Sequence, residues 1–297
     1  MALTALVVRP RRGRGGATPF QVAVLLLHIL FITIHVTTVG GDIASQTCLS
    51  PLVVGTTSTL TTSVEYVTDV VISPKGNKLY TTGSNYDIIR TVNVTTGSST
   101  ILAGVANSAG YRDGSVGTSA TNAAFNYPYG LAISSSGSAL YIADYNNARI
   151  RKIDLVALVV TTIAGGGTGT CVDAVGTAAS FLRPSGLALN YNNTLLYIAE
   201  QGGHKIRVMV LASGLVTTLV GPPSGTNPSG YVDGIGSAAQ FGNLQKIVVS
   251  ADGQTIYVSD GSNQGTPLAR LEGLSMPHIL LTSSTSTLHF SPKRYGK

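Results

Sequence analysis

The sequence predicts an all-β protein, and three observations carry this prediction. Charged residues make up only 11% of the 297 residues, whereas glycine occurs 35 times and tryptophan is absent. Threonine, valine, isoleucine and tyrosine are frequent, and these residues favour strands and tight turns over helices. A tyrosine-centred segment also recurs about every 60 residues, without a helical pattern between its copies. The length allows one substantial core or two modest ones.

The first 41 residues have the pattern of a targeting segment. Residues 1–19 are basic, with four arginines and no acidic residue, and residues 20–41 are mostly apolar. Such a pair of segments is typical of a signal peptide, and about 20 apolar residues also suffice to span a bilayer as a helix. We therefore expect a hydrophobic helix that is either a signal peptide or an uncleaved signal anchor. Either places the chain in the secretory pathway, membrane-anchored or extracellular.

The distribution of charge argues against nucleic acid as a partner. The formal net charge is +6, but the four arginines before residue 42 contribute +4 of it and the remainder carries only +2. A nucleic-acid-binding domain normally has a dense basic face that neutralises phosphates. We therefore expect no nucleic acid among the partners, and a membrane contact only through the amino-terminal segment.

Export changes how cysteine and asparagine are interpreted. Cys48 and Cys171 are the two cysteines, and in an oxidising compartment they either pair or stay free, since sequence spacing alone does not decide it. Asn93 and Asn192 begin Asn-x-Thr triplets, which have the form of N-glycosylation acceptors. Both asparagines lie at expected turns or strand ends, where a glycan is tolerated.

Each copy of the repeat begins with two strands joined by a tight turn. An apolar strand comes first, then a glycine or asparagine that tolerates positive φ, then a strand centred on a tyrosine. In the second strand, as in "ALYIAD", alternation places neighbouring side chains on opposite faces of the sheet. The four tyrosines are Tyr80, Tyr141, Tyr197 and Tyr257.

Two further strands complete the unit. The third has an arginine ten residues after the tyrosine in three copies, and the fourth closes on glycine. Four short antiparallel strands in a period of this length are typical of the blades of a β-propeller, so we predict about four blades over residues 59–272. We expect each arginine to pair with an acidic residue of its own or a neighbouring blade. These arginines are Arg90, Arg151 and Arg207.

The segments between blades repeat as well. Each contains a loop aspartate and ends on a phenylalanine, and two copies continue into Pro-x-Gly at residues 128–130 and 184–186. We interpret the aspartates as turn-capping residues and the phenylalanines as side chains that fill the space between blades. The aspartates are Asp113, Asp173 and Asp233, and the phenylalanines are Phe125, Phe181 and Phe241.

These motifs, in this order, resemble the NHL-repeat family of propellers. The pattern is Asp-Gly-x-Gly-x-x-Ala-x-Phe, Pro-x-Gly-Leu-Ala, Leu-Tyr-Ile-Ala-Asp, Asn-x-x-Ile-Arg and Thr-x-Ala-Gly. Three clear copies and a partial fourth cover roughly residues 60–272. The resemblance implies a propeller, and members of the family usually have six blades, which is more than this chain contains.

The ends of the array depart from the pattern. Blade one has Gly83 where the later blades have an acidic residue, and blade four gains residues before Arg270 and loses its closing strand. Residues 42–58 are either a linker or a closing strand for blade four, and residues 273–297 form an irregular tail. We expect an incomplete propeller or an open arc, whose exposed blade edges allow self-association.

The sequence has no recognisable catalytic or metal-binding constellation, and we assign no cofactor. After the leader the only histidines are His204, His278 and His289, of which just one lies inside a repeat. The glycine-rich run at residues 165–170 opens no helix, which argues against a phosphate site. The loop aspartates supply one carboxylate per copy, whereas Ca²⁺ needs several converging oxygens.

We therefore predict an exported or membrane-tethered propeller that acts as a non-catalytic binding module for a protein or a glycan. One alternative is a propeller-type hydrolase or lyase that uses Asp144, Glu200 and Asp260. A second is a truncated propeller without retained activity. A third, an RNA-binding propeller, requires that the apolar leader is not a targeting segment.

Overall fold

The computed structural model describes residues 59–61, 64, 66–114, 120–261 and 268–271, together with three short strands nearer the amino terminus. These strands join β4 (Thr59–Thr61) in a sheet of order β2-β3-β1-β4. They are β1 (Leu3–Ala5), β2 (Val24–Leu25) and β3 (Thr33–Val36). The sequence predicts a helix at residues 20–41. Of this segment only β2 and β3 are described, and the other residues lie outside the described part of the chain. Within the described part, no helix is long and apolar enough to cross a membrane.

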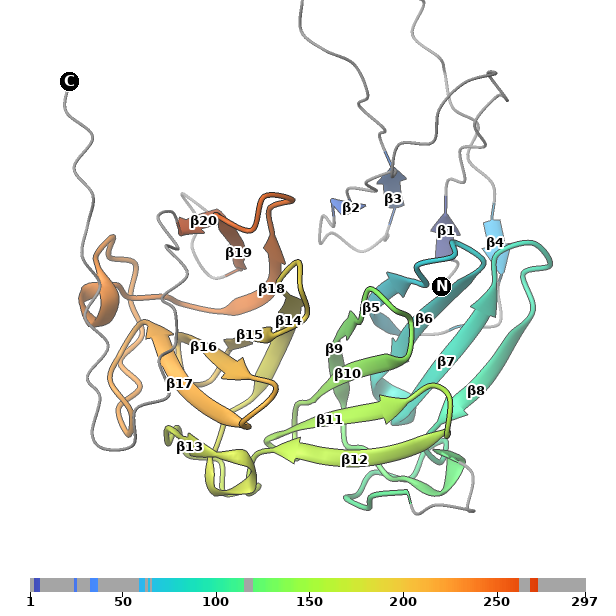
Figure 1. The fold of residues 1–297 in the computed structure, drawn as a ribbon, viewed down its shortest axis with the longest axis horizontal. Coiled ribbons are helices and arrows are strands. Elements are labelled where there is room, and N and C mark those ends of the chain that lie inside the picture. The colour runs from blue at the N-terminus through green and yellow to red at the C-terminus, as the bar shows by residue number, and fades with distance from the viewer. Residues whose placement is uncertain are drawn as a thin grey trace, which may run out of the picture.

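Four antiparallel sheets follow one another around the repeat region as propeller blades, shown in Figure 1. Within each sheet every strand pairs with the next strand of the chain, as the repeat predicts. Blade 1 contains β5 (Val67–Ile72), β6 (Lys78–Gly83), β7 (Ile88–Asn93) and β8 (Ser99–Ala103); blade 2 contains β9 (Pro128–Ile133), β10 (Ala139–Asp144), β11 (Arg149–Asp154) and β12 (Val159–Ala164); blade 3 contains β14 (Pro184–Leu189), β15 (Leu195–Glu200), β16 (Lys205–Val210) and β17 (Leu215–Val220); blade 4 contains β18 (Leu244–Val249), β19 (Ile256–Asp260) and β20 (Leu268–Leu271).

Short elements mark the turns and linkers. The two-residue strand β13 (Ala174–Val175) lies in the linker before blade 3 and pairs with the outer strand β17. One 3₁₀ turn, η1 (Ser84–Tyr86), joins β6 to β7. The other three lie in the linkers between blades: η2 (Ala120–Asn122), η3 (Gly176–Ala178) and η4 (Gly236–Ala238).

The blades form two faces of the propeller. We call the side with the turns between first and second strands, and between third and fourth strands, the hairpin face. The opposite side, the loop face, carries the turns between second and third strands and the linkers that lead into the inner strands. Backbone hydrogen bonds tie these two segments together: the N–H of Asn146 donates to Asn126 at 3.1 Å, and that of Gln201 donates to Arg183 at 3.0 Å. On the loop face, each turn between second and third strands is therefore held against the linker that enters the same blade.

The core lies between the blades, where the predicted alternation of the second strand is observed. Leu140 and Ile142 pack against blade 1, whereas Tyr141 and Ala143 pack against blade 3. The linker phenylalanines fill the same spaces, and Phe125 is completely buried between blades 1 and 2. Burying a phenylalanine side chain contributes roughly 1.5–3 kcal/mol, so each linker is part of the core.

The inner strands approach the propeller axis most closely at one equivalent position in each blade. A register shift interrupts every inner strand there, which is typical of a β-bulge. Blades 2 and 3 have Gly130 and Gly186 at this position. A Cβ atom on Gly130 would collide with the carbonyl oxygen of Ser185 in the next blade, and one on Gly186 would collide with the backbone of Gln245. The Pro-x-Gly motif therefore reflects close packing of backbones at the axis.

The terminal blades carry charged residues at the position of these glycines. Asp69 of β5 and Lys246 of β18 form an ion pair across the axis. The Oδ1 atom of Asp69 also accepts the N–H of Val70 at 2.7 Å, and its Oδ2 atom accepts the N–H of Leu131 in blade 2, also at 2.7 Å. One buried carboxylate thus contacts blades 1, 2 and 4, and the ion pair links blade 1 to blade 4.

Blade 4 differs from the others in its third strand. Tyr257 pairs with Arg270 in β20, and Val258 pairs with Ala269. In blades 2 and 3 the residue after the tyrosine pairs with an arginine, Arg151 or Arg207. Arg270 is therefore displaced by one residue from that position in the strand register. Residues 42–58 and 273–297, for which we expect a closing segment and a tail, lie outside the described residues.

Candidate functional site

The repeat tyrosines lie in the core. Tyr80, Tyr141 and Tyr197 are on the second strands of their blades and expose only 7%, 8% and 3% of their surface. Burial raises the pKa of all three hydroxyls. Tyr257 occupies the same position in blade 4 and is half-buried. These residues support the fold and do not form a binding surface.

Arg151 is the centre of a buried network in blade 2. Its Nη1 atom donates to Asp144 at 2.6 Å, and its Nη2 atom donates to Asp113 of the preceding linker at 2.8 Å. The guanidinium carbon lies 5.0 Å from the centre of the Phe125 ring. Burial raises the pKa of Asp144, and the positive charge of Arg151 opposes that rise. The network fastens the linker to the blade that follows it.

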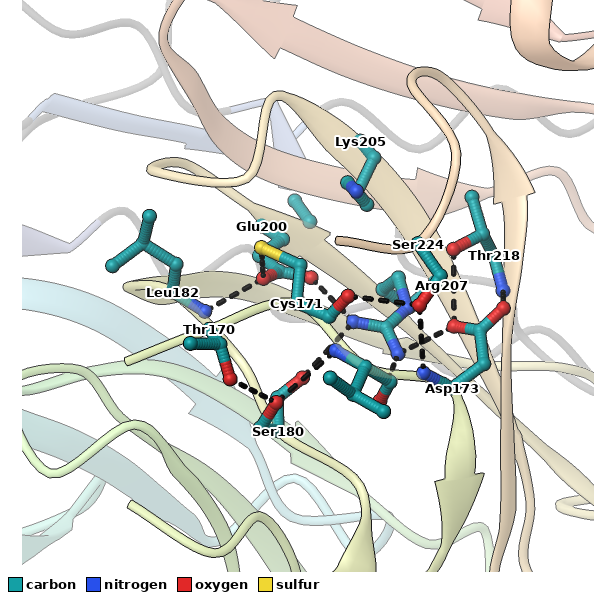
Figure 2. Close-up of polar contacts among 12 residues, drawn as sticks. Thr170, Cys171, Asp173, Ser180, Leu182, Glu200, Lys205, Arg207, Thr218 and Ser224 are labelled. Carbon is teal, nitrogen blue, oxygen red and sulfur yellow. Dashed lines mark hydrogen bonds and ion pairs between the residues drawn. The ribbon is translucent and has the colours of Figure 1, made fainter. Parts of the chain in front are cut away.

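Arg207 has the same role in blade 3, as Figure 2 shows. It donates from Nη1 to Glu200 at 2.7 Å and from Nη2 to Asp173 at 2.6 Å. Asp173 also accepts the N–H and the hydroxyl of Thr218, at 2.9 and 3.0 Å. Both Asp113 and Asp173 thus bind side chains of the next blade, which is more than the turn-capping role that the sequence indicates for them.

The three acidic residues of the alternative enzyme hypothesis accept backbone hydrogen bonds inside their own blades. Asp144 accepts the N–H of Asn126 at 2.9 Å, and Glu200 accepts that of Leu182 at 2.6 Å. Asp260, in blade 4, accepts the N–H of Gly242 at 2.7 Å. Each carboxylate therefore holds the linker at the start of its own inner strand, and all three are almost completely buried.

Cys171 belongs to the network of blade 3 (Figure 2). Its thiol donates to Oε1 of Glu200 at 2.8 Å, and burial together with that carboxylate raises the pKa of the thiol to about 12. A thiol that stays protonated is a poor nucleophile, so this cysteine is a structural hydrogen-bond donor. Cys171 is free in the structure; Cys48 lies outside the described residues, and their pairing stays a prediction.

Lys205 is a second buried group in blade 3. Its ammonium group donates to the carbonyl oxygens of Pro223 and Thr226, at 2.9 and 2.8 Å. Burial lowers the pKa of this lysine. The side chain therefore holds the linker between blades 3 and 4 in place, and that linker continues into the loop face.

The remaining predicted residues lie apart from these networks. Arg90 in blade 1 donates to Ser99 over 3.4 Å, and Asp233 is exposed in the last linker. Asn93 and Asn192 are both exposed at turns of the hairpin face, where N-glycosylation acceptors are accessible. Phe181 and Phe241 are buried in the clusters on either side of blade 3.

Three tyrosines of blade 2 form an aromatic cluster on the loop face. Tyr127 lies 6.2 Å from Tyr129 and 5.7 Å from Tyr145, between ring centres, and Tyr129 is stacked with Tyr145 at 5.7 Å. Burial, together with Tyr127 and Asp69, raises the pKa of Tyr129 to about 12. The hydroxyl of Tyr145 donates to Gln201 of blade 3, and the guanidinium of Arg183 lies 6.0 Å from the Tyr145 ring centre. The cluster is thereby continuous with blade 3.

A groove opens on the loop face where blades 3 and 4 meet. Its volume is about 640 Å³. The residues that line it come from the two linkers and from the turn between β15 and β16, and they include polar, aromatic and cationic side chains but no carboxylate. They are Leu182, Arg183, Gln201, Gly202, His204, Ser229, Tyr231, Gly242 and Asn243. Arg183 and Gln201 belong both to the groove and to the edge of the tyrosine cluster.

His204 fixes one wall of this groove. Its Nδ1 atom lies within hydrogen-bond distance of the carbonyl oxygen of Gly242. A carbonyl oxygen only accepts, so Nδ1 carries a proton and donates this hydrogen bond. The residue ties the turn of blade 3 to the linker of blade 4.

Positive φ values recur at fixed positions of the loop face. The last residue before an inner strand is in the left-handed region at Tyr66, Tyr127 and Arg183, with φ of 50°, 56° and 56°. Glycine or asparagine adopts this conformation more easily, and other residues there cost about 1–2 kcal/mol. The repeat geometry requires this conformation at the residue before the inner strand but does not require tyrosine or arginine there.

Sequence reasoning missed the groove because it searched for what the repeats share. Arg183 and Tyr127 are equivalent residues, each directly before a Pro-x-Gly motif. Gln201 and Tyr145 are likewise equivalent, each directly after the second strand of its blade. The signal was present as large residues that differ between copies at fixed places of the repeat. Within the described part of the chain, no group of three or more His, Cys, Asp or Glu residues is arranged to hold a metal ion.

Comparison with known proteins finds sequence relatives for the repeat region. The chain matches no protein-family model. It is 30% identical over 181 residues to NHL repeat-containing protein 2 of Homo sapiens, a match that covers 58% of this chain and 24% of that protein. The chain thus spans a quarter or less of the length of the curated relatives it matches.

Solved structures agree on the fold. A structural genomics protein of unknown function from Bacteroides thetaiotaomicron has a TM-score of 0.56 at 19% identity, covering 73% of this chain and 50% of that chain. An auxiliary nutrient binding protein from the same organism has a TM-score of 0.55 at 20% identity, covering 73% of this chain and 49% of that chain. The blade geometry is thus that of a β-propeller, and its repeats are similar to those of NHL repeat-containing protein 2.

Proposed function

We propose that this chain is a non-catalytic binding module whose ligand lies on the loop face, and that it is exported or membrane-tethered. The observation that carries the proposal is the groove between blades 3 and 4, which continues through Arg183 and Gln201 to the tyrosine cluster of blade 2. Ligand sites are typically concave, with aromatic walls and a few polar groups that fix orientation. This part of the loop face combines those features.

The buried networks support a binding role over a catalytic one. A catalytic acid must reach its substrate, and its pKa must suit the proton that it transfers. Asp144 and Glu200 instead lie under the surface, where arginines and backbone N–H groups occupy their oxygens. Cys171 is likewise held protonated by Glu200.

Two further observations support the class of function and the place of action. One structural neighbour is described as an auxiliary nutrient binding protein, and that description suits a propeller that binds without chemistry. The basic and apolar leader, residues 1–41, supports export. A glycosidase-induced mobility shift in a secretory host that disappears on joint Asn93→Gln and Asn192→Gln replacement would support the exported state. An unglycosylated chain retained in the cytosol would contradict it.

The binding function is tested with arrays of oligosaccharides and of peptides, probed with the labelled full chain. A loop-face variant, Tyr145→Ser with Arg183→Gln, should lose the signals that the wild-type chain gives. The matched control is Tyr191→Ser with Lys75→Gln, because this pair removes one exposed tyrosine and one exposed cation from turns of the hairpin face.

The outcomes separate the hypotheses. Signals lost only in the loop-face variant support the proposed surface. Signals lost only in the hairpin-face control place the ligand on the other face and contradict it. A folded chain that binds nothing on either array would favour the truncated propeller without activity.

A further inference from the structure

We propose that the groove between blades 3 and 4 binds an acidic oligosaccharide, a glycan with a carboxylate on its sugar rings, and that Arg183 binds this carboxylate. The inference rests on the proposed binding function and names the class of ligand. Three properties of the groove carry it: the charge of its lining, the kind of hydrogen-bonding groups that it presents, and the position of its aromatic side chains.

The charge of the lining favours an anion. Arg183 is exposed at the edge of the groove and has no ion pair among the described residues. The two nearest acids, Glu200 and Asp260, lie beneath the lining and accept backbone N–H groups of the linkers that form it. A guanidinium binds a carboxylate through two parallel hydrogen bonds, and this geometry suits a single carboxylate better than an isolated ammonium group would.

The hydrogen-bonding groups favour sugar hydroxyls. Gln201 and Asn243 present amides that both donate and accept, Ser229 presents a hydroxyl, and the ring of His204 has Nε2 as its second polar atom. A sugar hydroxyl also donates and accepts, so these groups match it from either side. Leu182 is the only aliphatic side chain of the lining. A peptide that anchors apolar side chains in a groove would find few partners here.

Aromatic rings lie in the groove and next to it. Tyr231 lies over the backbone of Gly242, because a Cβ atom on that glycine would collide with the tyrosine ring, and half of Tyr231 is exposed. Tyr145 lies beyond Arg183 and Gln201, at the edge of the aromatic cluster. An aromatic ring provides an apolar surface against which the C–H face of a sugar packs. Sites of about 300–1,000 Å³ are typical for small ligands, and this volume is within that range.

The position of the groove explains why Lys205 is buried. Its ammonium group holds the linker that carries Ser229 and Tyr231, by donating to Pro223 and Thr226. His204, the preceding residue, holds the other end of the same linker through Gly242. Two neighbouring residues of blade 3 therefore fix the linker between blades 3 and 4 at both of its ends, so this wall of the groove is preorganised before a ligand arrives.

The test is calorimetric titration of the full chain with trigalacturonate and, in parallel, with its methyl ester. The two probes have the same rings and hydroxyls and differ in charge. We expect the acid to bind about tenfold more tightly than the ester, because a charge-assisted pair is lost in the ester. Arg183→Gln should remove this difference by weakening only the acid, Arg183→Lys should restore part of it, and Lys75→Gln on the hairpin face should change neither. Unchanged unfolding midpoints verify that the variants fold.

Each other result overturns the inference in a distinct way. Equal binding of acid and ester, weakened for both by Tyr231→Ser, would mean a neutral glycan site, which leaves the proposed binding function intact. A preference for the acid that Arg183→Gln does not change would place the carboxylate elsewhere. If neither probe binds while loop-face signals on the peptide array persist, the ligand is a peptide. If no ligand of any class binds, the proposed function fails as well.

Discussion

Blades 2 and 3 differ from blades 1 and 4 in how each is held to its neighbours. In the inner pair, a buried arginine joins an acid of its own blade to the aspartate of the preceding linker. Among the described residues no such network is found in the terminal pair: Gly83 replaces the acid in blade 1, and Ala269 occupies the place of the arginine in blade 4. At the third position of the first strand, the charged residues are instead in the terminal blades. Blades 2 and 3 have glycines there, whereas blades 1 and 4 have Asp69 and Lys246, which form an ion pair.

The difference shows that equivalent positions of a repeat serve different purposes inside an array and at its ends. In blades 2 and 3 the arginine binds the aspartate of the linker that precedes its own blade. Blades 1 and 4 contact each other instead through the ion pair between Asp69 and Lys246. The loop face follows the same division, because its groove lies beside blade 3, where the buried network fixes the surrounding linkers.

The largest loss of unfolding free energy is expected when the buried arginine network of blade 2 or blade 3 is broken. Arg151→Met leaves Asp144 buried without its charged partner, and removal of one member of a buried pair typically costs about 3–5 kcal/mol. The matched change in a terminal blade, Arg90→Met, removes one long hydrogen bond to Ser99 and should cost about 1 kcal/mol or less. Urea unfolding of both variants measures the two free energies, and equal losses would contradict the division between inner and terminal blades.

A smaller loss is expected from filling the space at the axis. Gly130→Ala introduces a Cβ atom against the carbonyl oxygen of Ser185, and overpacking of this kind costs about 1–3 kcal/mol. Gly110→Ala is the control, since its Cβ atom would meet only the side chain of Ala124 at an ordinary distance of 3.6 Å. The midpoints of thermal unfolding compare the two, and a harmless Gly130→Ala would show that the inner backbones are further apart than described.

The axial ion pair should appear as a coupling between the terminal blades. Asp69→Asn and Lys246→Met, made singly and together, form a double-mutant cycle in unfolding free energy. We expect a coupling of about 0.5–3 kcal/mol, since residues in direct contact typically give values in this range. Asp69→Asn alone should cost the more of the two, because this carboxylate also accepts N–H groups from Val70 and Leu131. Strictly additive losses would mean that the two ends of the arc are not joined at the axis.

The effect that is smallest at neutral pH concerns Cys171, whose contribution to stability changes only above pH 9. Its pKa is about 12 in the folded chain and 9.0 as the ordinary value, so the unfolded chain loses this proton first as pH rises. The contribution to stability is therefore complete below pH 9 and is lost between pH 9 and about 12. Cys171→Ser should flatten the decline of unfolding free energy above pH 9.

Alkylation of the folded chain provides an independent measurement of the same group. Iodoacetamide at pH 8 should modify folded Cys171 far more slowly than it modifies glutathione, since the reactive species is the thiolate. Rapid modification would contradict a buried, protonated thiol. Modification only after denaturation and reduction would instead indicate that Cys171 is paired, as an exported chain allows.

The sequence predicted the blades because packing requires the same residues in every copy. The tyrosine strand, the positive-φ turn and the linker phenylalanine each recur, and each lies where the repeat places it. The ion pair between Asp69 and Lys246 and the groove were not predicted. Both are formed by residues that differ between copies of the repeat, and a comparison of the copies detects only what they share. Lys246 and Asp69 lie 177 positions apart, and no local pattern connects them. Arg183 and Gln201 meet through the closure of a turn onto a linker, which only the folded chain shows.

The location of a bound ligand tests the central claim most directly. A crystal structure of the full chain with saturating trigalacturonate should show the sugar in the groove between blades 3 and 4. Its carboxylate should lie against Arg183, with one ring packed on Tyr231. A sugar bound on the hairpin face or at a blade edge, or an empty groove at saturation, would contradict the account.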